Sequence, residues 1–315
     1  MNLQPLIKTK DLIVNKKSFI IGKMLRAVMY ILLLDLCVVF VYPFLYMMIT
    51  SVKSPTDIND ATITWIINQF YFHNYELAYE GLNFIPALLR TVLYCIVTTG
   101  GHTLVCSFVG YGFARYDFKG KKFFFMLLLL AMVIPVQTII VPQYLLYSAI
   151  GMSNGFGALV LPSFFGYGLR GALFIFLFRQ FYLSLPKSLE EAAAVDGCTP
   201  VSTFFKIALP ASTSSVVVTI VLSIVWHWNE FYEPSIYLTK SEQKLLPMLL
   251  PNIYNAIGGG GNEAEALISG GEVDLYTAGV AMAATFLVVL PVIIFYLVFQ
   301  KQFRQGIETS GLTGE

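Results

Sequence analysis

Charged residues are scarce in this chain. Asp, Glu, Lys and Arg make up 12% of its 315 residues, whereas about 25% is usual for a soluble globular domain. Hydrophobic residues make up 57%, and the net charge is only +1. This composition excludes a disordered chain, a coiled coil and almost any soluble enzyme with a hydrated surface, and the balanced charge gives no indication of nucleic-acid binding. It predicts a single membrane domain that crosses the bilayer several times.

Three kinds of chemical site are also missing. The cysteines stand singly, without the spacing of a disulfide framework or a metal site: Cys37, Cys95, Cys106 and Cys198. His73 and His102 have no partner at metal-ligand spacing, so we expect no bound metal. The Gly-Lys-Lys tripeptide at 120–122 lacks the flanking residues of a phosphate-binding loop. We therefore expect no ATPase site and no bound cofactor in this chain.

Six apolar segments are long enough to cross a bilayer, which takes about 20 residues of helix. The 47 residues between Lys122 and Arg170 carry no charge. As one helix they would be roughly 70 Å long, more than twice the thickness of the hydrocarbon core, so they must fold back. Glycines and an asparagine in 150–157 mark the turn. The predicted spans are about 27–50, 88–114, 123–147, 157–178, 211–232 and 277–299.

These spans predict an all-α polytopic membrane protein with six transmembrane helices. Pro135 and Pro142 in the third span, and Gly166 and Gly168 in the fourth, predict kinked helices. We expect a polar N-terminal segment (1–26), a transmembrane domain (27–300) and a C-terminal tail (301–315). The first apolar stretch is too long for the core of a signal peptide, so it is expected to be an anchor.

Basic residues indicate the orientation. If the N-terminus is cytoplasmic and the spans alternate, 15 of the 20 Lys and Arg residues lie inside. Only three lie outside: Lys53, Lys240 and Lys244. By the positive-inside rule, both termini are expected in the cytoplasm.

The cytoplasmic loop between the fourth and fifth spans, about 184–210, predicts two short helices. Ser188 and Glu191 fit a capping box at the start of the first helix. Gly197 fits the left-handed position that ends it, and Thr199-Pro200 fits the start of the second. The alanines at 192–194 are expected on its outer surface, where they would let the helix lie close in a groove of another protein. The alternative is an amphipathic helix that rests on lipid headgroups.

Residues of this loop resemble a known family. Glu191-Ala-Ala, Gly197 and Ile207-Ala-Leu-Pro210 are similar to the signature loop of ATP-binding-cassette importer permeases. Other segments resemble the maltose-type carbohydrate permeases within that family: Gly110-Tyr-Gly-Phe-Ala-Arg115, Gly120-Lys-Lys122, Phe176-Leu-Phe-Arg-Gln-Phe181, Trp228-Asn-Glu-Phe231 and the tail at 303–314. The external loop at 251–276 looks longer than is usual in the family.

The resemblance implies that an ATPase subunit grips the two short helices. It implies an ATPase-coupling role for Glu190, Glu191, Ala192, Ala193, Asp196 and Gly197. It also implies that the C-terminal tail reaches between the ATPase subunits through Gly306, Gly311 and Gly314. The implied partners are a related but different companion permease, two ATPases and an extracellular solute-binding protein, all at a bacterial cell membrane.

A polar and aromatic cluster lies near the outer end of the fifth span. Aromatic faces pack well against sugar rings, and Asn and Glu bind hydroxyl groups, so this cluster is the candidate substrate path: Trp226, Trp228, Asn229, Glu230 and Tyr232. The alternative is an aromatic belt at the membrane interface. We interpret Asp35 and Arg170, which also lie within spans, as structural charges in the first instance.

The leading interpretation is therefore a permease subunit of an ATP-driven sugar or oligosaccharide importer. One alternative is an importer of the same kind for another solute, such as a peptide or a polyamine. Another is an ion-coupled secondary carrier, which would favour an internal repeat and several membrane carboxylates. A membrane-embedded enzyme is the weakest alternative, because no metal-binding or nucleophile–base motif stands out.

Overall fold

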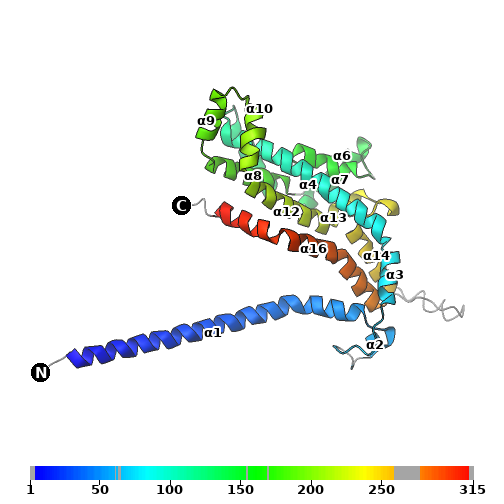
Figure 1. The fold of residues 1–315 in the computed structure, drawn as a ribbon. Helices are drawn as coiled ribbons and strands as arrows, with labels where there is room; N and C mark the ends of the chain where they lie inside the picture. The colour runs from blue at the N-terminus through cyan, green and yellow to red at the C-terminus, as the bar shows by residue number, and fades with distance from the viewer. Residues whose placement is uncertain are drawn as a thin grey trace.

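The computed structural model describes residues 4–60, 62, 65–153, 155–168, 170–258 and 277–311. Within these residues the chain is helical and contains no β-strand, with one isolated bridge between Lys53 and Phe70. Figure 1 shows a bundle of helices from which one long N-terminal helix diverges. The all-α expectation is confirmed.

The first half of the chain contains two of the three longest helices, α1 and α4. They are α1 (Gln4–Ser51), α2 (Pro55–Asn59), α3 (His73–Gly81), α4 (Phe84–Arg115), α5 (Lys121–Val133), α6 (Val136–Ala149), α7 (Gly157–Val160) and the 3-10 helix η1 (Leu161–Phe165).

The second half contains the short helices of the predicted loop and the last long helix. The elements are α8 (Gly171–Ser184), α9 (Ser188–Val195), α10 (Pro200–Thr203), the π-helix η2 (Phe204–Ala208), α11 (Leu209–Ala211), α12 (Thr213–Asn229), α13 (Tyr232–Tyr237), the 3-10 helices η3 (Ser241–Gln243) and η4 (Leu246–Leu249), α14 (Leu250–Gly258) and α16 (Ala278–Gly311).

The described residues contain fewer helices of membrane-spanning length than the six expected spans. Among the described residues, three helices are long and apolar enough to cross a membrane: Gly22–Ser51, Phe84–Arg115 and Ala278–Gln302. Two bent pairs, α5 with α6 at 104° and the 200–211 segment with α12 at 77°, raise the count to at most five. The expected six spans are therefore not confirmed.

The predicted fourth span, 157–178, is not one helix. The chain breaks between η1 and α8, where Gly166, Gly168 and Arg170 have φ values of 67°, 106° and 63°. These left-handed conformations cannot continue a right-handed α-helix, so α8 retains only 14 residues. The glycines thus end a helix here, whereas the sequence predicted a kink. Pro135 likewise precedes α6, at the 104° bend between α5 and α6.

Helix α4 lies in the middle of the bundle and packs against α8 and α12. The approach to α8 is closest at Gly110, where an added Cβ would lie 2.7 Å from the Cβ of Phe178 and 3.0 Å from the backbone N of Arg179. No side chain larger than hydrogen fits there without displacing α8. The two buried clusters of the bundle both include residues of α4.

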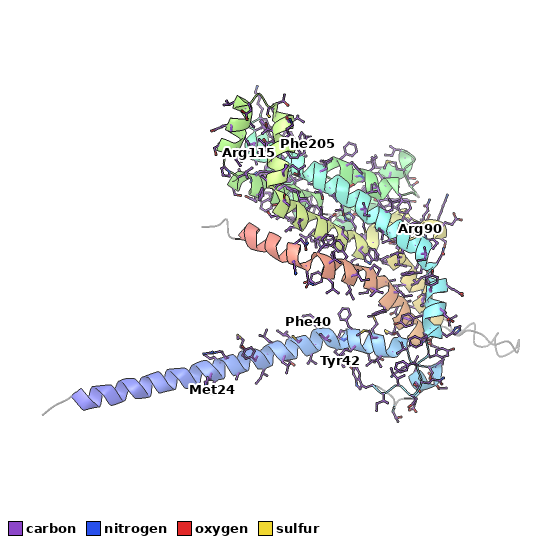
Figure 2. All side chains as sticks on the ribbon, viewed as in Figure 1. Met24, Phe40, Tyr42, Arg90, Arg115 and Phe205 are labelled. Carbon is purple, nitrogen blue, oxygen red and sulfur yellow. The ribbon has the colours of Figure 1, made fainter. Side chains whose placement is uncertain are left out.

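Helix α1 leaves the bundle and contacts it mainly through α16 (Figure 1). From Met24 to Leu45 its large apolar side chains are exposed, and Figure 2 shows Met24, Phe40 and Tyr42 along it. Asp35 is also exposed on this helix. Such a surface needs lipid or another protein against it.

Candidate functional site

The predicted two-helix loop projects from one end of the bundle. Figure 1 shows α9 and α10 beyond the ends of α4 and α8, with the last turns of α16 at the same end of the molecule. Gly306 and Gly311 belong to α16, whereas Gly314 lies outside the described residues. The loop and the start of the tail therefore face the same side.

The start of α9 differs from the prediction. Lys187 occupies the N-cap position with helical backbone angles and no side-chain cap, while the backbone N–H groups of Glu190 and Glu191 donate to its carbonyl, both at 3.0 Å. Ser188 is already inside the helix, so the proposed capping box with Glu191 is wrong. The turn that follows Pro186 satisfies these donors with backbone, and no hydroxyl is needed.

The junction between α9 and α10 agrees with the prediction. Gly197 has φ +79°, and the N–H of Cys198 donates to the carbonyl of Ala193 at 2.9 Å. Thr199 caps α10 by accepting from the N–H of Ser202 at 3.3 Å, with Pro200 first in the helix. The left-handed glycine ends one helix and the threonine begins the next.

Of the six predicted coupling residues, two face inward: Ala193 is only 3% exposed, and Glu190 is turned toward the bundle. The other four are exposed, and so are Ala194 and Val195, which were not among the predicted residues; Val195 is 88% exposed. We call these six exposed residues the α9 surface: Glu191, Ala192, Ala194, Val195, Asp196 and Gly197. The expectation of an outward alanine face was thus wrong for Ala193.

Glu190 is held by an arginine at the end of α4. The Nε of Arg115 donates to Oε1 of Glu190 at 2.7 Å, and its Nη2 donates to the carbonyl of Leu185 at 2.6 Å. The two side chains are 5% and 18% exposed. A charge-assisted pair in a nearly buried position is rigid and costly to break. We call this contact the Arg115 clamp.

The second half of the loop is anchored by aromatic packing. Phe204 is fully buried, and its ring lies 5.1 Å from that of Phe108 and 5.3 Å from that of Tyr111, both on α4. Tyr182 of α8 hydrogen-bonds to the hydroxyls of Ser107 at 2.7 Å and Ser212 at 3.1 Å. Both halves of the loop are therefore fixed to the same end of α4.

A cavity of about 610 Å³ lies where three helical breaks meet. The first is the break between α5 and α6 at Pro135, the second is the left-handed segment before α8, and the third follows α12 at Glu230. Its polar lining comes from all three: Gln137, Tyr167, Arg170, Glu230, Tyr232 and Glu233. An imidazole nitrogen of His102 is hydrogen-bonded to the Tyr167 carbonyl at 3.1 Å, which fixes the second break.

The charges around this cavity are of both signs. Arg170 lies over the ring of Trp226 at 5.4 Å, and Glu230 accepts from the backbone N–H groups of Tyr232 and Glu233 at 3.0 and 3.2 Å. Burial, and secondarily the nearby Glu230, raise the pKa of Glu233 to about 7. Arg170 supplies a positive charge beside the two carboxyl groups of Glu230 and Glu233.

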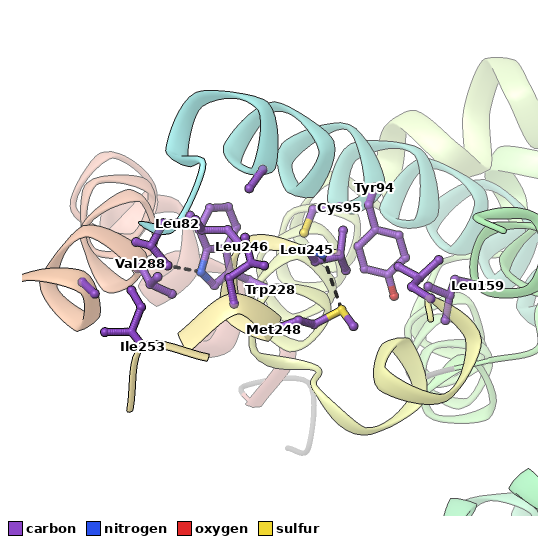
Figure 3. Packing of buried hydrophobic residues seen from close by; sticks show 14 of the residues in the cluster. Leu82, Tyr94, Cys95, Leu159, Trp228, Leu245, Leu246, Met248, Ile253 and Val288 are labelled. Atoms are coloured by element: carbon purple, nitrogen blue, oxygen red, sulfur yellow. Dashed lines mark hydrogen bonds between the residues drawn. The ribbon is translucent and has the colours of Figure 1, made fainter. Parts of the chain in front are cut away.

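The predicted substrate-path residues do not share one surface. Glu230 and Tyr232 line the cavity, and Trp226 contacts the arginine that does. Trp228 is 5% exposed and donates to the carbonyl of Val288 at 3.2 Å in the core shown in Figure 3. The Asn229 amide donates to the carbonyl of Val225 at 2.8 Å. Trp228 is thus turned toward α16 and away from the cavity. It lies two positions before Glu230 at the end of α12, and residues at that spacing on a helix point in different directions.

Sequence reasoning missed Arg115, Arg170 and Glu233 as site residues. Arg115 ends the Gly-Tyr-Gly-Phe-Ala-Arg motif, and the glycines before Arg170 predicted a kink in the fourth span. The pairing of Arg115 with Glu190 has no sequence signal, because the two residues are 75 positions apart.

Comparison with known proteins gives one family. The family described as binding-protein-dependent transport system inner membrane component matches residues 106–309. The chain is 30% identical over 277 residues to the probable ABC transporter permease protein YurM of Bacillus subtilis (strain 168), covering 87% of this chain and 84% of that protein.

Two further proteins extend the similarity. The arabinooligosaccharides transport system permease protein AraQ of Halalkalibacterium halodurans is 30% identical over 284 residues, covering 87% of this chain and 91% of that protein. A chain of a bacterial ABC transporter involved in the import of the acidic polysaccharide alginate has a TM-score of 0.76 at 20% identity. That match covers 89% of this chain and 97% of the other, and it shows a shared fold.

Replacing Arg115 should loosen the loop. Arg115→Gln leaves Glu190 as a nearly buried charge without its partner, at a local cost of about 3 kcal/mol. Hydrogen exchange of α9 amides in the purified protein should therefore become faster. Lys121→Gln breaks an exposed pair with Asp117, in which the side chains are 24% and 99% exposed. It is the matched control, expected to cost less than about 1 kcal/mol. Equal exchange of α9 in both variants would contradict the clamp.

Proposed function

The chain belongs to the family of binding-protein-dependent transport system inner membrane components, and on that premise we propose that it is the permease subunit of an ATP-driven sugar or oligosaccharide importer. The observation that carries the proposal is the α9 surface, an exposed face whose base is held to α4 by the Arg115 clamp. A loop that only joined two spans would need neither feature. The similarity to the arabinooligosaccharide permease supports a carbohydrate substrate.

We place the loop and both termini in the cytoplasm. The support is the excess of basic residues, 15 of 20, on the segments that this orientation puts inside. It is also supported by the position of α9, α10 and the last turns of α16 at one end of the molecule (Figure 1). In this orientation segment 1–26 and tail 301–315 are cytoplasmic, and the location is a bacterial cell membrane.

The proposed partners would cover the exposed surfaces of this chain and would bind the ATP for which it has no phosphate-binding loop. Two ATPases would bind ATP and Mg, and one of them would contact the α9 surface, with the tail from Gly306 onward reaching toward them. The exposed apolar side of α1 fits lipid together with a companion permease, related to but different from this chain. A solute-binding protein would deliver the sugar at the opposite end.

The cavity at the three breaks is the proposed substrate path in this chain. Glu230, Glu233 and Tyr232 supply groups that bind hydroxyls, and Tyr167 supplies an aromatic face. Non-helical backbone inside a membrane protein is tolerated where it lines such a cavity. Movement of α9 would change the angle between the broken segments and so open the cavity to one side or the other.

Reconstitution tests the function. The chain, its companion permease and its ATPases are placed in proteoliposomes with the binding protein outside, and uptake of a radiolabelled oligosaccharide is followed. We expect uptake only with ATP inside, and a loss of about tenfold or more for Glu191→Arg on the α9 surface. Uptake driven by an ion gradient without ATPase, or uptake of a peptide or polyamine only, would contradict the proposal.

The same vesicles test the cavity. Arg170→Gln and Glu230→Gln should each lower uptake by about tenfold, because a charge-assisted contact to the substrate is lost, while the complex still assembles. Glu242→Gln removes an exposed carboxylate outside the cavity and is the control. Trp228→Ala should lower the yield of folded protein, since it empties a core position. Normal uptake by both cavity variants would assign the cluster to the membrane interface.

A further inference from the structure

Each end of α4 carries an arginine whose side chain holds a neighbouring loop. At one end Arg115 binds Glu190 and the carbonyl of Leu185. At the other end Arg90 donates from Nε and Nη2 to the carbonyl of Lys244, at 3.3 and 3.2 Å. Figure 2 shows the two arginines at opposite ends of the same helix. Arg90 and Lys244 are 154 positions apart in sequence, and their contact has no role in the function proposed above.

The segment that Arg90 holds is packed onto α4 by more than this contact. The N–H of Leu246 donates to Oγ1 of Thr91 at 2.8 Å, while that hydroxyl donates to the carbonyl of Ala87 at 2.7 Å. Leu245 and Leu246 are 1% and 0% exposed, and Figure 3 shows them beneath α4 beside Trp228 and Cys95. Residues 244–249, which we call the outer segment, are therefore registered to α4 by polar and apolar contacts together.

Helix α4 is suited to carry movement between these two contacts. Arg90 and Arg115 are 25 positions apart, which at 1.5 Å per residue is about 37 Å, more than the hydrocarbon core of a bilayer. The helix runs from Phe84 to Arg115 without a break, whereas the chain bends sharply between α5 and α6 and ahead of α12. A rotation or shift at one end of such a helix is passed to the other end.

We propose that α4 is a rigid linkage between the coupling loop and the outer segment, and that Arg90 is the positioning residue that ties the outer segment to it. This inference rests on the proposed function, in which the binding protein docks at the end of the molecule where the outer segment lies. Docking there shifts the position of the outer segment. Helix α4 moves with that segment because Arg90 and Thr91 bind it, and the Arg115 clamp passes the movement to α9. By linkage, the state of the ATPases biases the outer segment to the same extent.

The test is the stimulation of ATP hydrolysis by the substrate-loaded binding protein in the reconstituted complex. Arg90→Gln should lower the stimulation by about tenfold, while the basal ATPase rate without binding protein stays within about twofold, which a misfolded complex would not show. Arg90→Lys keeps the charge but loses the two-donor fork. Its stimulation should therefore lie between that of the wild type and that of Arg90→Gln. Lys240→Gln removes an exposed charge close to the outer segment in sequence and should leave stimulation unchanged.

The double variant separates a linkage from two independent contacts. If Arg90 and Arg115 act in one path, Arg90→Gln with Arg115→Gln loses no more stimulation than the worse single variant. Losses that multiply, normal stimulation in Arg90→Gln, or an equal loss in Lys240→Gln would overturn the proposal. If Arg90→Gln does not assemble, Thr91→Val is measured in its place against Thr91→Ser, with the same outcomes. A wild-type complex that takes up no sugar would instead refute the proposed function.

Discussion

The uninterrupted course of α4 is the constraint on which the rest of the structure depends. Its 32 residues keep their helical hydrogen bonds from Phe84 to Arg115, and α8 approaches it so closely at Gly110 that a methyl group would collide with Phe178. The two-helix loop at one end and the outer segment at the other are both fixed to this helix. The two helices that pack most extensively on it, α8 and α12, each follow a break in the chain, whereas α4 itself spans from the loop at one end to the outer segment at the other.

The breaks in the helices place polar groups around one cavity. A helix interrupted inside a membrane exposes polar backbone, which must be satisfied within the protein. Here the Glu230 carboxylate accepts from two backbone N–H groups after α12, and His102 is hydrogen-bonded to the Tyr167 carbonyl. The same breaks bring Arg170 and two carboxylates to one cavity. The continuous helix α4 thus holds the two ends of the molecule, while the breaks in the neighbouring segments form the cavity.

Local sequence rules predicted the parts of the site that depend on local physics. The left-handed Gly197 and the Thr199 cap follow from backbone sterics and hydrogen bonding within a few residues. The inward turn of Glu190 and the burial of Trp228 depend on Arg115 and Val288, which are 75 and 60 positions away. No local pattern records such partners. The count of six spans is not confirmed for a related reason, because apolar length does not reveal where a helix breaks.

The central claim is that the α9 surface receives the ATPase while the opposite end faces the binding protein. Site-directed cross-linking in membranes tests it directly, with the four native cysteines replaced by serine. A thiol-to-amine cross-linker on Val195→Cys should yield an adduct with the ATPase subunit, and the same reagent on Lys240→Cys, which is also exposed, should not. An ATPase adduct from Lys240→Cys, or none from Val195→Cys in an assembled complex, would contradict the account.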